Sequence, residues 1–212
     1  MDAIIYPLLK GVPYTFALTA AAFVTGLVIG IPVCAMRRSR VWIARSIAIF
    51  FILMLRGIPP LVWLFLVFFG IGSGYFSMSP FVAAWASLGL ICGVNIAEIY
   101  RGSLAAVDRG QWEASHALGL PARNTLFEII GPQVIRISIP AAATYAIGLL
   151  KDTAVASVIG VPELAFQAYF TSQNTFKGLE VYSIVALLYI GLSLPIAWFS
   201  RVVDAKMRAR VA

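Results

Sequence analysis

Long apolar runs separated by short polar stretches dominate the pattern of hydrophobic and polar positions along this chain. A helix needs about 20 apolar residues to cross a bilayer. Five runs reach roughly that length, and they predict spans over residues 14–36, 47–72, 81–100, 134–155 and 182–203. We therefore expect an all-α integral membrane protein in which residues 1–212 form one domain, a bundle of about five transmembrane helices.

The second run contains a predicted break, because Pro59 and Pro60 follow Arg56 closely. Proline removes a backbone donor and clashes with the preceding helical turn. One interpretation is a broken helix that lines a transport path. The favoured interpretation is a structural kink, with Arg56 reaching headgroups at the cytoplasmic edge and residues 41–55 free to lie along the interface. The pattern leaves open whether Arg56 lies inside the membrane.

A polar, arginine-bearing stretch over residues 108–140 separates the third and fourth runs. Its side chains would be unsatisfied in lipid, so it must face water. Asp108 suits a helix N-cap, with Gln111 completing an Asp version of the capping box. Gly119 suits the C-terminal end of that short helix.

A second short helix is predicted from Pro121, because proline is tolerated in a first helical turn. It should end before Gly131 and Pro132. Isolated helices of this length are marginal in water. The pattern therefore indicates that a docked partner protein holds the segment.

The same stretch resembles the EAA signature of permease subunits in ABC importers. The matching residues are Glu113-Ala114-Ser115, Gly119, Ile135 and Pro140. The segments AEIYRG (97–102), LLKDT (149–153) and RGIPPLVWLFLVFFG (56–70) resemble the polar amino-acid uptake branch, the histidine, glutamine and arginine type. The resemblance implies that the loop 108–131 holds a cytoplasmic coupling helix that sits in a cleft of an ATPase. Its coupling residues would be Glu113, Ala114, Ser115, His116 and Gly119.

The resemblance also implies a function. The chain would be the permease subunit of an ATP-driven importer that moves a polar amino acid or related small polar solute into the cytoplasm. Its partners would be a second permease subunit, identical or homologous, two cytoplasmic ABC ATPase subunits, an extracytoplasmic solute-binding protein, the solute and membrane lipid. ATP and Mg would bind the ATPase, so no cofactor is expected in this chain. A methionine-type permease is the nearer alternative, and a self-contained carrier or channel the more distant one.

Composition and charge agree with a membrane location. Of the 212 residues, 61% are hydrophobic and only 12% are charged, about half the charged fraction of a soluble domain. The net charge of +7 is concentrated in alternate loops and at the C-terminus: Arg37, Arg38, Arg40 and Arg45, then Arg101, Arg109, Arg123 and Arg136, then Arg201, Lys206, Arg208 and Arg210. This alternation follows the positive-inside rule and needs no nucleic-acid partner. It predicts a multi-pass protein of the bacterial inner membrane, with the N-terminus outside and the C-terminus in the cytoplasm.

Residues for catalysis or metal binding are missing from the sequence. There is no GxxxxGK[ST] phosphate loop, and His116 is the only histidine. Cys34 and Cys92 lie in apolar runs without a disulfide or metal-binding pattern, so they are predicted packing residues. The chain is therefore expected to be a transport subunit and not an enzyme.

Ionisable and polar residues within the spans are the remaining candidates, since they are costly in lipid. Glu98 and Arg101 are three residues apart at a span end and are expected to form a structural pair. Asn95, Thr144, Asp152 and Glu163 are the candidate residues of a solute path. Asn95 stands where the family usually has an aromatic residue, Thr144 where it has Asn, Trp63 where it has Gln, and Ile58 where it has Thr. These departures leave the solute open.

The outer segment 163–177 mixes aromatic and polar residues and predicts a short helix on the outer face. An interfacial aromatic belt and a docking surface for an external partner are equally compatible with its composition.

Overall fold

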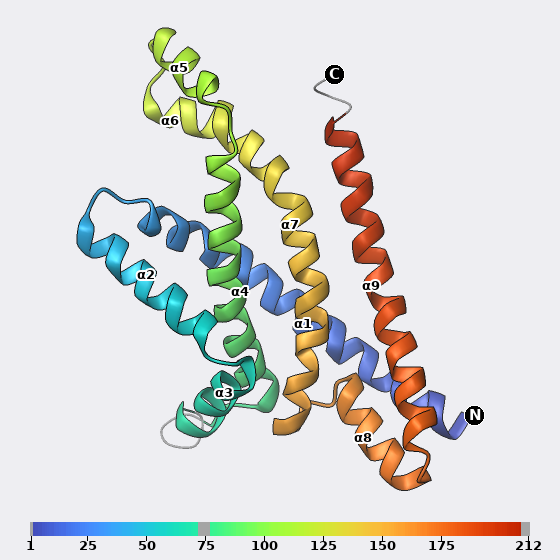
Figure 1. Cartoon of the computed structure of the whole chain (residues 1–212). Helices are drawn as coiled ribbons and strands as arrows, with labels where there is room; N and C mark the ends of the chain where they lie inside the picture. The colour runs from blue at the N-terminus through green and yellow to red at the C-terminus, as the bar shows by residue number, and fades with distance from the viewer. Residues whose placement is uncertain (1, 72–76, 209–212) are drawn as a thin grey trace.

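The computed structural model describes residues 2–71 and 77–208, and helices make up nearly all of these ranges (Figure 1). The α-helices are α1 (Asp2–Arg37), α2 (Trp42–Gly57), α3 (Pro60–Phe65), α4 (Pro80–Ala105), α5 (Arg109–Ala117), α6 (Ala122–Asn124), α7 (Gly131–Asp152), α8 (Leu164–Thr175) and α9 (Gly178–Arg208). Two π-helical segments, Leu66–Ile71 and Thr125–Ile130, and the 3-10 helix Thr153–Ile159 extend them. The predicted all-α class is confirmed for the described residues.

Four helical stretches within the described residues are long and apolar enough to cross a membrane: Ala3–Arg37, Pro80–Ala105, Ala122–Ile159 and Gly178–Val203. They contain the predicted spans 14–36, 81–100, 134–155 and 182–203. The first begins well before residue 14, although Pro7 and Pro13 lie inside it. Ile4 and Leu8 are buried against α8 and α9, and this packing stabilises the N-terminal turns beyond what local sequence indicates.

The second predicted span is not a single straight helix. α2 and the stretch Pro60–Ile71 meet at 102°, so they form a broken span or a re-entrant loop. The break lies where the proline pair predicts it, with Pro59 in a non-helical conformation as the N-cap of α3. Residue 72, the predicted end of this span, lies outside the described residues.

The helix from Pro121 does not stop before Gly131, as the sequence predicts. Residues 125–130 form a π-helical segment that joins α6 to α7 within one helical stretch. Pro132 directly follows the π-helical segment, where the backbone hydrogen-bond register changes, and the helix continues through it.

α1 and α4 form the centre of the molecule and cross closely (Figure 1). Gly26 and Gly30 on α1 and Gly89 and Gly93 on α4 are two GxxxG pairs. A Cβ on Gly93 would lie 2.7 Å from Cγ2 of Ile29, and a Cβ on Gly30 would lie 2.7 Å from Cγ2 of Ile96. Small residues therefore let the two backbones approach, as in other membrane helix pairs.

The two ends of the bundle carry different segments (Figure 1). α5 and α6 project from one end, and α9 ends on the same side. The start of α1, α3 and α8 lie at the opposite end. α8 confirms the short helix predicted over residues 163–177.

Candidate functional site

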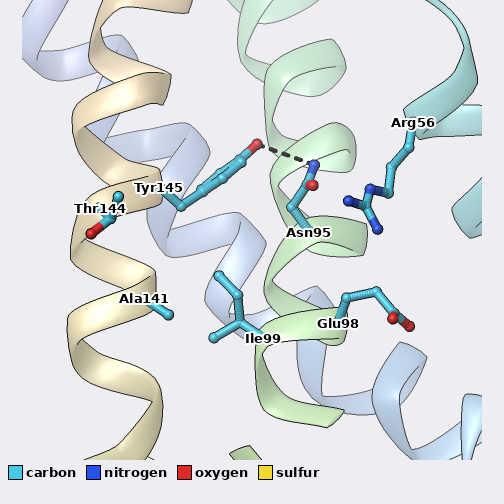
Figure 2. Close-up of a pocket in the computed structure, with 7 residues that line it drawn as sticks. All are labelled: Arg56, Asn95, Glu98, Ile99, Ala141, Thr144 and Tyr145. Carbon is cyan, nitrogen blue, oxygen red and sulfur yellow. Dashed lines mark hydrogen bonds between the residues drawn. The ribbon is translucent and has the colours of Figure 1, made fainter. Parts of the chain in front are cut away.

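A pocket of about 520 Å³ opens between the end of α2, the middle of α4 and the middle of α7 (Figure 2). Its lining residues are Arg56, Asn95, Glu98, Ile99, Ala141, Thr144 and Tyr145. Two of the four predicted path residues, Asn95 and Thr144, are therefore brought to one place from two different helices.

Asn95 links two walls of the pocket. Its Nδ2 donates to the carbonyl oxygen of Ile91 at 2.8 Å and to the Tyr145 hydroxyl at 3.4 Å. The second bond joins α4 to α7 and is drawn in Figure 2. Within the described residues, Oδ1 of Asn95 accepts no hydrogen bond, so it remains available as an acceptor.

Thr144 lies at the edge of the pocket. Its hydroxyl donates to the Pro140 carbonyl oxygen at 3.0 Å, a bond within α7. The side chain is exposed, and Figure 2 shows it on the side of α7 away from Asn95. Thr144 therefore contributes to the rim more than to the interior.

The pocket carries charges of both signs, but only one is paired. Glu98 forms the predicted pair with Arg101, at 2.8 Å between Oε2 and a guanidinium nitrogen. Arg37 Nε lies 3.8 Å from the other carboxylate oxygen of Glu98. Arg56 forms no ion pair within the described part of the chain, and its guanidinium extends toward Asn95 and Glu98 (Figure 2).

Sequence reasoning did not place Arg56 or Tyr145 in this pocket. Arg56 follows a helix, and polarity alone does not reveal which way a side chain points at a helix break. Tyr145 is aromatic, so it reads as part of an apolar span although its hydroxyl faces a polar partner. The neighbouring polar residue Thr144 was the sequence feature that indicated a pocket at this part of α7.

The structure does not bring Asp152 and Glu163 into the pocket. Asp152 is exposed at the end of α7, and no ion pair joins it to Lys151 in the described residues. Glu163 was expected at the water-facing outer surface, but its side chain is 0% exposed. It caps α8, accepting from the Phe166 backbone N–H at 2.7 Å and from the Tyr189 hydroxyl at 3.0 Å. Burial raises the pKa of the Glu163 carboxyl above its ordinary value. The hydrogen bonds to the carboxyl from Ala165, Phe166, Tyr189 and Thr15 offset only part of this increase.

The polar loop at the other end of the bundle folds largely as the sequence predicts. Asp108 caps α5 by accepting from the Gly110 N–H at 2.7 Å, and Gly119 adopts a positive φ of 67° after the helix ends. The capping box is not formed, because Gln111 instead accepts a bond from Gln133 on α7 at 3.2 Å. Trp112 packs on Val107, Ile130 and Val134, so the chain itself holds the loop, and not a partner alone.

The predicted coupling residues divide into exposed and buried ones. Glu113, Ala114, His116 and Gly119 are exposed. Ser115 is only 1% exposed, and its hydroxyl donates to the Gln111 carbonyl oxygen at 2.7 Å. Ser115 therefore lies on the inner face of α5 and cannot belong to an exposed docking surface. Leu118, which the sequence did not single out, is 75% exposed beside Gly119.

Solved structures share this architecture. One, described as the crystal structure of an amino acid ABC transporter with histidines, is 29% identical and matches with a TM-score of 0.89 over 95% of this chain and 94% of that chain. An inward-facing structure of the MetNI methionine ABC transporter, 24% identical, matches with a TM-score of 0.78 over 97% of this chain and 98% of that chain. The second likeness supports the fold alone.

Similar sequences extend over nearly the whole chain. YckA of Bacillus subtilis, a probable amino-acid ABC transporter permease protein, is 34% identical over 93% of this chain and 88% of its own length. TcyB of Bacillus subtilis, an L-cystine transport system permease protein, is 32% identical over 98% of this chain and 89% of its own length. GlnP of Escherichia coli, a glutamine transport system permease protein, is 32% identical over 95% of this chain and 93% of its own length. Residues 6–209 match the family described as the binding-protein-dependent transport system inner membrane component, and the chain belongs to that family of membrane permease subunits.

Proposed function

We propose that this chain is the transmembrane permease subunit of an ATP-driven importer that carries a polar amino acid or related small polar solute into the cytoplasm. The observation that carries the proposal is the pocket between α2, α4 and α7, where polar and charged side chains converge within an otherwise apolar bundle. Polar groups within a membrane-spanning bundle are costly unless they face protein or water. Amino-acid permeases among the relatives support the same solute class.

The remaining parts of the machine lie outside this chain. A second permease subunit, identical or homologous, completes the pathway, and two ATPase subunits bind ATP and Mg. An extracytoplasmic solute-binding protein delivers the solute. The whole chain forms one transmembrane domain in the inner membrane, with the N-terminus outside and the C-terminus inside. The positive-inside distribution of arginine supports this orientation, and the start of α1 and the end of α9 lie at opposite ends of the bundle, as an odd number of spans requires.

The exposed face of α5 and the turn at Gly119 form the coupling surface for the ATPase. Glu113, His116 and Leu118 are the side chains that this surface presents. ATP-driven movement at the surface biases the bundle between two access states, which requires that docking differ between those states.

The test begins with extraction of the chain from its host membrane in a mild detergent and identification of the proteins that co-purify. An ABC ATPase is the expected partner. The complex and its binding protein are then reconstituted in vesicles, and uptake of labelled amino acids is measured with and without ATP. Uptake that requires ATP supports the proposal. A chain that purifies alone and transports amino acids without ATP overturns it.

A further inference from the structure

We infer that the junction of α1 and α2, residues 38–45, binds anionic phospholipids of the surrounding membrane, and that Arg38, Arg40 and Arg45 hold the phosphate groups. This inference goes beyond the proposed function. It depends neither on the solute nor on the energy source of transport, because it concerns a surface at the edge of the molecule and not the pocket.

Uncompensated positive charge is the first property of this junction. Arg38, Arg40 and Arg45 are exposed, and within the described residues none of them forms an ion pair. No Asp or Glu occurs in the sequence between Asp2 and Glu98, so no acidic neighbour along the chain offsets these charges. A guanidinium stays protonated at physiological pH, and its planar fork matches the oxygens of a phosphate. The junction therefore suits an anionic headgroup.

Arg37 differs from the three arginines that follow it, although it lies beside Arg38 in sequence. It is half-buried, and its Nε lies 3.8 Å from Oε1 of Glu98, an oxygen that accepts no hydrogen bond within the described residues. The other carboxylate oxygen of Glu98 lies 2.8 Å from Arg101. Glu98 is thus matched by Arg37 and Arg101, and the charges of the other three arginines remain available to a ligand.

Exposed apolar side chains lie among these arginines. Val41, Trp42 and Ile43 have 61%, 69% and 61% of their surface exposed. A tryptophan with one apolar and one polar edge favours the level of the lipid headgroups, and arginines beside a span bind the phosphates there. The mixture of basic and apolar side chains therefore indicates a membrane boundary and not a surface in contact with water alone.

The competing partner is a protein with an acidic surface, such as the proposed ATPase. Figure 1 shows the junction at the edge of the molecule, apart from α5 and α6, which project from the end of the bundle. Arg109 on α5 is exposed between Asp108 and Gly110, without a large apolar residue beside it. A lipid headgroup with its acyl chains suits the basic and apolar junction, whereas a protein surface suits the polar α5.

The test uses the full chain, purified with its co-purifying subunits in an uncharged detergent. Its melting temperature is measured as dioleoyl phosphatidylglycerol or dioleoyl phosphatidylcholine is added, since a ligand that binds the folded state stabilises it. Phosphatidylglycerol should act at a concentration at least about tenfold lower than phosphatidylcholine, and this preference should shrink at about 1 M salt, which screens exposed charges. Equal stabilisation by the two lipids would overturn the inference.

Variants then test the three arginines. Each basic residue near an anionic surface contributes about fivefold in affinity, so replacing all three by Gln should weaken phosphatidylglycerol binding on the order of a hundredfold. Replacing all three by Lys keeps the charge and should preserve most of the binding. The control removes the same charge from exposed positions elsewhere, with Lys10→Gln, Lys177→Gln and Arg201→Gln, and should bind as the wild type does.

Two results of the variant experiment contradict the inference. Wild-type binding of phosphatidylglycerol by the Gln variant would show that the three arginines do not hold the lipid. Loss of the co-purifying ATPase from that variant, with lipid binding unchanged, would assign the junction to a protein contact instead. A failure of ATP-dependent amino-acid uptake would refute the proposed function without affecting either lipid measurement.

Discussion

Glu163 shows how a single buried carboxyl can organise the end of the bundle that carries α8. It caps α8 and receives the hydroxyl of Tyr189 from α9. Beside it, the Leu164 N–H donates to Thr15 Oγ1 on α1 at 3.1 Å. Gly11 of α1 makes this approach possible, because a Cβ there would lie 2.7 Å from the backbone of Leu164. Hydrogen bonds therefore join α8 to both α1 and α9 at this end of the bundle, in addition to apolar packing.

The Glu163–Tyr189 bond gives a prediction at the residue scale. Tyr189→Phe removes one donor to a carboxyl that has no exposed surface, and leaving a buried group unsatisfied costs about 1–3 kcal/mol. We expect a lower melting temperature of the detergent-purified complex. Tyr182→Phe, an exposed site on the same helix, is the control and should melt like the wild type. Equal melting of the two variants would show that the bond contributes nothing to stability.

At the scale of elements, the α5 loop combines exposed side chains with a fixed backbone. Trp112 anchors its inner face, while Leu118 is exposed at its end. The positive φ of Gly119 sets the direction in which the chain leaves α5. A docking element needs this combination, since a rigid surface loses little conformational freedom on binding.

The turn at Gly119 gives the second prediction. Gly119→Val places a β-branched side chain at a φ of 67°, which such residues rarely adopt. Glu113→Lys reverses a charge on the exposed face of α5. Both proteins should insert normally but lose most ATP-dependent uptake and most stimulated ATP hydrolysis.

A matched variant serves as the control for the loop. Gly102→Val alters a helical glycine with no heavy atom within 4 Å of the added Cβ. It should retain far more uptake than Gly119→Val. Uptake at the wild-type rate in both Gly119→Val and Glu113→Lys would remove the loop from the coupling mechanism.

The crossing of α1 and α4 gives the third prediction. Gly93→Val forces a side chain against Ile29, and overpacking of this kind costs about 1–3 kcal/mol. Gly148→Val on α7 meets no heavy atom within 4 Å and is the control. The melting temperature of the purified complex should fall more in Gly93→Val than in Gly148→Val. The same melting temperature for both would argue against a tight α1–α4 crossing.

The elements also show what local sequence can and cannot predict. The proline pair predicted the helix break at Pro59, and the polar stretch 108–140 predicted the α5 helix. Both features depend on backbone rules that act within a few residues. The join of α6 to α7 was missed, since a π-helical segment has no simple sequence signal. The N-terminal turns of α1 depend on α8 and α9, which are distant in sequence. Polarity identified Asn95, but only tertiary structure placed Arg56 beside it.

At the scale of the whole molecule, the orientation in the membrane gives the fourth prediction. Cys34 and Cys92 are buried, so the native thiols should give little background with an impermeant thiol reagent. Ser172→Cys on α8 should react from the outer side of intact cells. His116→Cys on α5 should react only after the membrane is opened. Labelling of His116→Cys from outside would reverse the proposed topology.

The continuous helical stretch from Ala122 to Ile159 has a mechanical consequence. Its 38 residues extend about 57 Å at the α-helical rise, so it forms a lever arm from the α5 end of the bundle to the α8 end. Tyr145 lies just past the midpoint of this lever, and the Glu163 contacts lie near its far end. Movement of this stretch relative to α4 would change the distance between Asn95 and Tyr145, which a hydrogen bond of 3.4 Å joins.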